Sequence, residues 1–164
     1  MKFIADAMLG RLAKWLRILG FDVLYYPDIE DREIVRIARE QERTILTRDT
    51  QLTKRSGLPG VIFVEKDNVF DQLTFIRTLL GFSQVDISGR CAVCNGIIDE
   101  VPQKEEVRDL VPDFIYFNSP GFMRCRDCGK VYWEGSHRKG MREKVKGVVP
   151  VSRKWLPGGE EGKQ

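Results

Sequence analysis

The chain has 164 residues, of which 42% are hydrophobic and 31% are charged. That length leaves room for one ordinary domain and a small module, and the hydrophobic share is high enough to form a buried core. The composition therefore excludes a chain that is disordered throughout.

The net charge of +3 is unevenly distributed. Residues 1–88 contain as many acidic as basic side chains, whereas residues 136–154 carry a single acid, Glu143. The bases in that segment are Arg138, Lys139, Arg142, Lys144, Lys146, Arg153 and Lys154. A basic tail after a neutral domain is typical of a protein with a polyanionic partner. A solvated, disordered tail is the alternative interpretation.

The first residues of the sequence do not resemble a secretory signal. The apolar run at residues 3–5 is broken at once by Asp6, so we expect no signal peptide here. No uninterrupted apolar stretch approaches the length that spans a bilayer, so we expect no membrane partner. We therefore expect a cytoplasmic protein whose thiols stay reduced.

All four cysteines fall into two Cys-x-x-Cys pairs, Cys91 with Cys94 and Cys125 with Cys128. Two thiolates of one tight turn can occupy two corners of a tetrahedron, and a facing turn can supply the other two. This spacing predicts a structural zinc site. Two disulfides or a redox-active pair are the alternatives, which a reducing compartment and the matched spacing make less favourable.

The surroundings of the cysteines add three expectations. Gly96 and Gly129 each follow a pair, where such turns often need a positive φ. The segment between the pairs is longer than in compact zinc fingers, so we expect an insertion there. His137 is the only histidine and could replace a ligand, but with four cysteines present we interpret it as a surface or substrate-side residue.

Hydrophobic periodicity predicts alternating strands and helices before the first cysteine. The expected strands are residues 2–6, 23–26, 44–47 and 61–64, and the expected helices are residues 9–19, 32–42 and 69–80. Gly20 is expected to end the first helix, and Asp31 to cap the second. This order predicts an α/β fold with a mostly parallel sheet. Residues 83–89 would be a joint, and residues 157–164 would be disordered.

Acidic residues lie at or just after the ends of three predicted strands. Asp6 ends the first predicted strand, after the apolar run at residues 3–5, and Asp49 lies just past the third. The pair Glu30 and Asp31 lies between the second strand and its helix. The carboxyl ends of parallel strands form the ligand-binding edge of such sheets, so these acids should converge. Clustered carboxylates suit Mg²⁺ or Mn²⁺, which can support phosphodiester cleavage. An N-cap role for Asp31 and a turn-starting role for Asp49 are the alternatives.

Arginines accompany these acids. Arg11 and Arg48 flank the predicted cluster, where each guanidinium could bind phosphate oxygens with two hydrogen bonds.

The segments FIADAMLGRLAKWLRILGFDVLYY and RTILTRD, the pair Glu30 and Asp31, and the motifs RCAVCN and RCRDCGKVYWEGSH together resemble the Mut-seven C-terminal RNase domain family. The resemblance covers roughly residues 1–141. It implies an α/β fold with a PIN-like, mostly parallel sheet flanked by helices, followed by a small zinc ribbon. It also implies a metal-dependent ribonuclease.

The resemblance implies that the PIN-type acids correspond to Asp6, Asp49, and Asp31 or its neighbour Glu30. PIN-like proteins often carry one more carboxylate shortly after the third, but here no acid follows Asp49 before Glu65.

We therefore expect a PIN-like nuclease domain at residues 1–82, a zinc ribbon at residues 88–135 and a basic, partly disordered tail at residues 136–164. The function would be hydrolysis of RNA, with structural Zn²⁺ and catalytic Mg²⁺ or Mn²⁺. The expected RNA-binding residues are Arg11, Lys14, Arg17, Arg48, Tyr132, Trp133, His137, Arg138 and Lys139. They would act through phosphate contacts and base stacking, although Trp133 could equally be a packing residue.

Two rival functions remain open. One is a non-catalytic adaptor that binds RNA or a protein partner and keeps a vestigial acidic site. The other is cleavage of DNA, because carboxylate-bound metal chemistry does not require a 2′-hydroxyl.

Overall fold

The computed structural model describes residues 1–82 and 89–149 and has a mixed α/β architecture. Its larger sheet has four parallel strands in the order β2-β1-β3-β4. The strands are β1 (Lys2–Ala5), β2 (Asp22–Tyr25), β3 (Thr44–Thr47) and β4 (Val61–Phe63). Each lies within one residue of its predicted bounds, and the predicted parallel sheet is confirmed.

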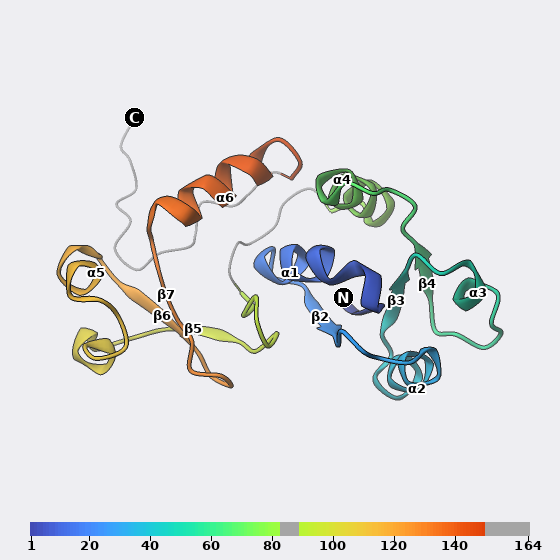
Figure 1. Cartoon of the computed structure of the whole chain (residues 1–164), viewed down its shortest axis with the longest axis horizontal. Coiled ribbons are helices and arrows are strands. Elements are labelled where there is room, and N and C mark those ends of the chain that lie inside the picture. Colours follow the sequence, from blue (N-terminus) through green and yellow to red (C-terminus); the bar gives the residue numbers. More distant parts are fainter. Residues whose placement is uncertain (83–88, 150–164) are drawn as a thin grey trace.

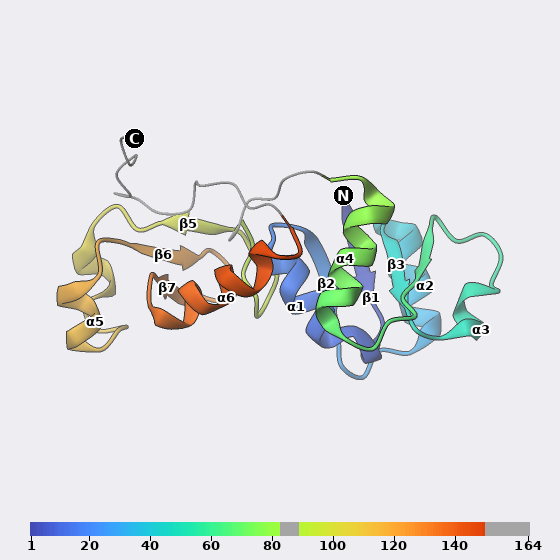
Figure 2. The same ribbon diagram turned by 90° about the horizontal axis from the view of Figure 1, so that it is seen from above.

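Helices cover both faces of this sheet (Figures 1 and 2). After β1 comes a short 3-10 helix (Ala7–Leu9) that leads into α1 (Gly10–Ile18). The other helices are α2 (Asp31–Gln41), α3 (Thr50–Thr53) and α4 (Val69–Leu80). Side chains of α1 and α4 share one core with Phe3 and Leu46, while α2 packs on Ile4 and Ile45 on the opposite face. Strand side chains alternate between the two faces, so each strand contributes to both cores.

The helix ends follow local sequence signals, with one exception. Gly20 has a φ of 88°, and the N–H of Phe21 donates to Leu16 O at 3.0 Å, as expected for a glycine-terminated helix. The predicted cap of the second helix is wrong. Asp31 is the first residue of α2, the cap position belongs to Glu30, and no side chain bonds the cap. Asp31 instead contributes negative charge to the first turn, which favours the positive end of the helix dipole.

Cys125 ends a strand of a smaller antiparallel sheet with the order β5-β6-β7, and the other three cysteines lie in turns beside this sheet. Its strands are β5 (Ile98–Glu100), β6 (Phe122–Cys125) and β7 (Val131–Trp133). The predicted insertion is confirmed between β5 and β6, where it holds a 3-10 helix (Lys104–Val107) and α5 (Asp113–Asn118). A small core of Val107, Val111 and Phe122 lies beneath it.

The segment predicted as a tail begins with a helix, α6 (Ser136–Lys146), which the sequence analysis did not anticipate. Figures 1 and 2 show α6 running from the end of β7 toward α4. Val145 and Val149 are fully buried in the core shared by α1 and α4, and Arg77 Nη1 donates to Val148 O at 2.8 Å. The described residues Val145, Val148 and Val149 therefore pack on the larger unit and do not form a solvated tail.

Two predicted features fall outside the described ranges, namely the disordered end at residues 157–164 and all of the joint at residues 83–89 except Gly89. Within residues 1–82 and 89–149, no helix combines the length and apolar character that membrane crossing requires.

Candidate metal centre and acidic edge

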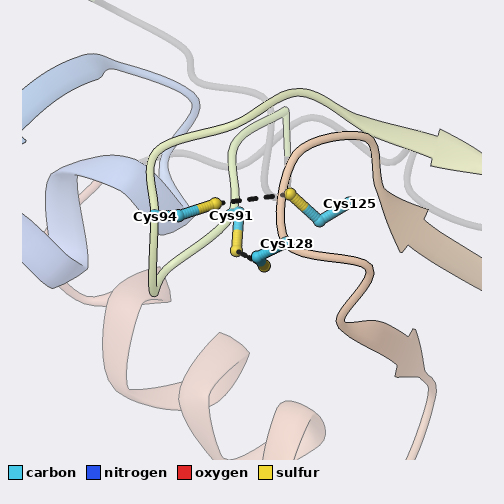
Figure 3. Close-up of side chains that lie close together, drawn as sticks. All are labelled: Cys91, Cys94, Cys125 and Cys128. Carbon is cyan, nitrogen blue, oxygen red and sulfur yellow. Dashed lines mark hydrogen bonds between the residues drawn. The ribbon is translucent and has the colours of Figure 1, made fainter.

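The four cysteines meet at one point between two facing turns (Figure 3). Their sulfur atoms all lie within 4.8 Å of one another. Cys91 Sγ is 3.6 Å from Cys128 Sγ, and Cys94 Sγ is 3.4 Å from Cys125 Sγ. Sulfurs held about 2.3 Å from a tetrahedral zinc ion would lie about 3.8 Å apart. All four thiols are free, so the cluster is compatible with zinc and contains no disulfide.

The two cysteine turns have matching backbones. In each, the residue four positions after the first cysteine is left-handed, Asn95 with a φ of 71° and Gly129 with a φ of 71°. The expectation for Gly129 is confirmed. The expectation for Gly96 is wrong, because the left-handed residue is Asn95. Gly96 is needed for a different reason, since a Cβ there would lie 2.8 Å from Cys125 Sγ and 2.5 Å from Asp127 Oδ2.

The thiols differ in acidity. Burial opposes ionisation of Cys91, but the hydrogen bond between its Sγ and the Tyr132 hydroxyl, at 3.0 Å, helps to hold the pKa of Cys91 at about 6. Burial and the neighbouring sulfurs raise the pKa of Cys94 to about 12. Four thiolates this close together need a cation, which is the role that a structural zinc ion fulfils. Tyr132 is thus a hydrogen-bond partner of a candidate ligand.

The first cysteine turn is joined to the larger sheet through Asn95. Its Oδ1 accepts from Val23 N at 3.0 Å, and its Nδ2 donates to Asp22 Oδ1 at 2.8 Å. Asp22 also pairs with Arg43, at 2.7 Å, and with Arg90, at 3.4 Å. Although burial opposes ionisation of Asp22, these partners hold its pKa below the usual value. Val23 lies in the edge strand β2, so side chains complete an edge that another chain could otherwise pair with.

Arg17 belongs to the same junction, which corrects its predicted role. Its side chain was expected beside Arg11 and Lys14 on the RNA-binding side of α1. The residue is only 6% exposed, and its guanidinium donates to Val23 O at 2.8 Å and to Val93 O at 2.9 Å. Nη1 also donates to Ala92 O at 3.4 Å, so this buried guanidinium is directed at backbone carbonyl oxygens and not at the solvent side where phosphate would bind. Arg17 is therefore a structural link between β2 and the cysteine turn.

Two of the predicted acids lie at the carboxyl ends of the neighbouring strands β1 and β3. The chain passes from β1 to β2 on one side and then to β3 on the other, so this is the point where the strand order reverses. Asp6 is 6% exposed and its Oδ2 accepts from Thr47 Oγ1 at 2.5 Å and from Arg48 N at 2.8 Å. Thr47 Oγ1 accepts from Asp49 N at 2.9 Å. Thr47 thus connects the Asp6 carboxylate to the backbone N–H of Asp49.

Asp49 also begins α3. Its Oδ1 accepts from Gln51 N at 2.7 Å, which makes it the N-cap of that short helix. The turn-starting role considered for Asp49 is therefore present. It leaves Oδ2 of this partly exposed side chain without a hydrogen bond among the described residues.

The other predicted acids are paired with arginines. Asp31 Oδ2 lies 3.2 Å from Arg55, and Glu30 Oε2 lies 2.7 Å from Arg32. Arg48 pairs with Asp67, which follows β4. Across residues 1–82 and 89–149, the cysteines form the only group that brings three or more candidate ligand atoms within 4.8 Å. The carboxylates thus share an edge of the sheet but do not together form a complete set of metal ligands.

The remaining predicted RNA-binding residues differ in how much the structure shows. Arg11 and Lys14 are exposed on α1, one turn apart. Tyr132 and Trp133 are partly buried in β7, where they pack on different small cores. The backbones of His137, Arg138 and Lys139 form part of α6, but their side chains are outside the described set.

Sequence analysis missed three residues of this region. Thr47 was treated only as a strand end, although a hydroxyl near two acids in the sequence can indicate a hydrogen-bonding link between them. Asn95 was overlooked because its partners lie more than 70 positions earlier in the chain. Asp67 was not considered, although it follows β4 on the same edge as the other acids.

Comparison with known proteins identifies the family. The model of the Mut7-C RNAse domain matches residues 1–145, which span both sheets and nearly all of α6. No curated protein and no solved structure matches the chain. The chain belongs to the Mut7-C RNAse domain family.

Proposed function

We propose that the protein is a metal-dependent ribonuclease with a PIN-like α/β domain and a zinc ribbon. The observation that carries this proposal is the linkage of Asp6 and Asp49 through Thr47 at the reversal point of the sheet. Ligands of open parallel sheets bind at this position. Family membership supports a ribonuclease-like role for the site.

The donor set of this edge suits a hard divalent ion. A carboxylate has about four lone-pair positions, and Asp6 accepts three hydrogen bonds, from Met8 N, Thr47 Oγ1 and Arg48 N. One position remains for an ion. Asp49 uses Oδ1 for its cap and retains Oδ2. Mg²⁺ is often held by one or two carboxylates, with water and substrate phosphate completing its shell.

When bound, such an ion would lower the pKa of a water and stabilise charge on the cleaved phosphate. The protein's own contribution is to fix the two acids. Thr47 and Arg48 N hold Asp6 in one orientation, and the α3 cap does the same for Asp49. We assign phosphate binding to Arg11, which is exposed at the start of α1. Asp31 and Glu30 would enter the site only after exchanging their arginine partners.

A second candidate function is an adaptor that binds RNA without cutting it. The observation that favours it is that the described residues contain no cluster of three carboxylate ligands, while Asp31 and Asp67 are engaged by arginines. Such pairing would neutralise the acidic edge and let a polyanion approach. The two functions share RNA binding and differ in whether a divalent ion leads to cleavage.

The decisive variant is Asp49→Asn. Asparagine is as good an N-cap as aspartate, so α3 should persist while one negative charge is lost. We expect unchanged thermal stability and a fall of at least about 100-fold in cleavage of labelled single-stranded RNA with Mn²⁺ or Mg²⁺, comparable to the loss of one charge-stabilising group in other active sites. Asp109→Asn is the matched control, because Asp109 is exposed in the distant insertion.

Three outcomes separate the candidates. Full cleavage by Asp49→Asn with unchanged metal dependence would remove Asp49 from the site. Wild-type protein that binds RNA but cuts it with no divalent ion would establish the adaptor. Equal cleavage of single-stranded DNA in a parallel reaction would broaden the substrate class beyond RNA.

A further inference from the structure

A second site lies away from the acidic edge, between the larger unit and the zinc-ribbon unit. It is a pocket of about 260 Å³ whose walls come from α1, the first cysteine turn, β7 and α6. The walls include Lys14, Arg90, Lys130, Tyr132, Trp133 and Met141. This volume is near the lower end of the range for small-molecule sites, so a ligand the size of one nucleotide fits better than a dinucleotide cofactor.

The charge of the pocket selects an anion. Lys14, Arg90 and Lys130 contribute to its lining, and no described lining residue is acidic. Arg90 is already held by Asp22, at 3.4 Å, and by Asn95 O, at 3.0 Å. Lys14 is exposed and makes no hydrogen bond or ion pair with the described residues. The lysine ammonium groups are therefore the positions where phosphate oxygens would bind.

The walls between these cations suit an aromatic ring. Most of the lining surface is apolar, and Ile18, Val131, Trp133 and Met141 contribute to it. Trp133 lines the pocket and is only partly buried. β7 is also an edge strand, which brings backbone hydrogen-bonding groups to the wall. A flat base with polar edges matches both the apolar lining and the backbone hydrogen-bonding groups. A lipid chain would match only the first, and a simple oxyanion only the second.

The two sides of the pocket are joined rigidly. Arg17 connects α1 to the first cysteine turn through Val93 O, and Asn95 fixes that turn to β2. Lys14 is also one helical turn from Arg11, which lies nearer the acidic edge. The strip from Arg11 to Lys14 therefore leads from the proposed cleavage site to the pocket.

We propose that this pocket binds one unpaired nucleotide of a single-stranded RNA, with its base on the apolar wall beside Trp133 and its phosphate at Lys14 and Lys130. The inference rests on the proposed function, because it makes the pocket a subsite for the strand that is cut. The pocket would hold a base a short distance from the cleaved bond and so favour unpaired RNA over duplex.

The test measures binding without cleavage. Zinc-loaded protein in buffer without added divalent ions is titrated by calorimetry with adenosine monophosphate, with ribose 5-phosphate and with the trinucleotide ApApA. Ribose 5-phosphate carries the same phosphate but no base. We expect it to bind roughly 5- to 150-fold more weakly than adenosine monophosphate, the factor that stacking of one base supplies. The trinucleotide should bind more tightly than the mononucleotide.

Lys14→Glu should weaken adenosine monophosphate binding at least about tenfold, because it replaces an attractive charge by a repulsive one. Lys54→Glu is the matched control, since Lys54 is exposed beside α3, remote from the pocket. Because Lys14 is exposed, both variants should fold like the wild type. Equal affinity for ribose 5-phosphate and adenosine monophosphate would overturn the base-binding role.

The remaining outcomes test the position of the ligand, its class and the link to the proposed function. Unchanged nucleotide binding by Lys14→Glu would place the nucleotide elsewhere. A trinucleotide that binds no better than the mononucleotide would overturn the assignment to an RNA strand. Failure of the proposed function has a different signature, since nucleotide binding would persist while RNA stayed intact with every divalent ion. RNA cleavage without nucleotide binding in the pocket would refute only this inference.

Discussion

The link between the cysteine turn and the larger sheet can be tested by replacing Asn95 with glycine. Asn95 has a φ of 71°, and glycine adopts that conformation without strain. The Asn95→Gly variant therefore keeps the backbone of the turn and removes only the side chain. Two hydrogen bonds disappear, one from the buried N–H of Val23 and one to the carboxylate of Asp22.

The expected loss of stability follows from those two bonds. An unsatisfied buried N–H costs about 1–3 kcal/mol, and a hydrogen bond to a charged group contributes about 1.5–3 kcal/mol. Water that reaches Asp22 would restore part of the second contribution. We therefore expect the free energy of unfolding to fall by about 2–4 kcal/mol, which lowers the Tm by roughly 5–15 °C for a chain of this size.

Three measurements check this expectation. Urea unfolding followed by circular dichroism gives the free energy, metal analysis shows whether zinc is retained, and hydrogen exchange reports on the Val23 amide directly. Exchange at Val23 should accelerate in Asn95→Gly even when zinc is bound. Because glycine also increases the freedom of the unfolded chain, a second comparison uses Asn95→Asp with and without Asp22→Asn.

Asn95→Asp places a second carboxylate beside Asp22 and should destabilise the protein, whereas the double variant restores a donor and acceptor pair and should recover part of the loss. A zinc-bound Asn95→Gly protein with wild-type stability and a protected Val23 amide would refute the reasoning. So would a double variant that is no more stable than Asn95→Asp alone.

Three further predictions concern zinc, acid and the C-terminal helix. Cys125→Ser should lose the one zinc expected per chain and unfold residues 89–133, leaving a destabilised but folded parallel sheet. Metal analysis and hydrogen exchange test this prediction. A variant whose residues 89–133 stay folded without zinc would contradict it. Because the folded pKa of Asp22 is depressed, its stabilisation is fully present above the ordinary pKa of about 3.9 and disappears as the pH falls through the folded value. In that acidic range, the free energy of unfolding should therefore depend less steeply on pH for Asp22→Asn than for the wild type. Truncation at residue 135 removes the buried side chains of Val145 and Val149 and should cost about 3–6 kcal/mol, measurable in urea; unchanged stability would show that α6 is not part of the core.

The sequence predicts the parallel sheet well because its signals are local. Each strand is a short apolar run followed by a turn residue, and α4 matches its predicted range because Val69, Leu73 and Ile76 repeat at helical spacing. The acidic edge follows from the same logic, since topology alone places Asp6 and Asp49 at neighbouring strand ends. Topology does not predict which hydrogen bonds and ion pairs each carboxylate makes, because these depend on Thr47 and on arginines from other segments.

The errors share a physical cause. Arg17 was placed on the exposed side by its charge, although it lies four residues after the buried Ala13 and therefore on the same helix face. Its charge is accommodated by carbonyl oxygens of a turn 75 positions later. The helix α6 was missed because basic residues and glycines hide the spacing of Met141, Val145 and Val149. In both cases the stabilising partner lies far along the chain, where no periodicity within one segment can indicate it.

The two sheets are therefore less independent than their separate cores imply. β2 is an edge strand, yet the outward N–H and C=O of Val23 are bonded by Asn95 and Arg17 rather than by another strand. Asn95 is the left-handed residue of the first cysteine turn, so folding of that turn also presents the Asn95 side chain to β2. Zinc binding by the cysteines, completion of the β2 edge and closure of the proposed nucleotide pocket would then depend on the same turn. Loss of the metal should thus expose an unpaired strand edge and open the pocket, while the Asp6, Thr47 and Asp49 linkage on the other side of β1 stays intact.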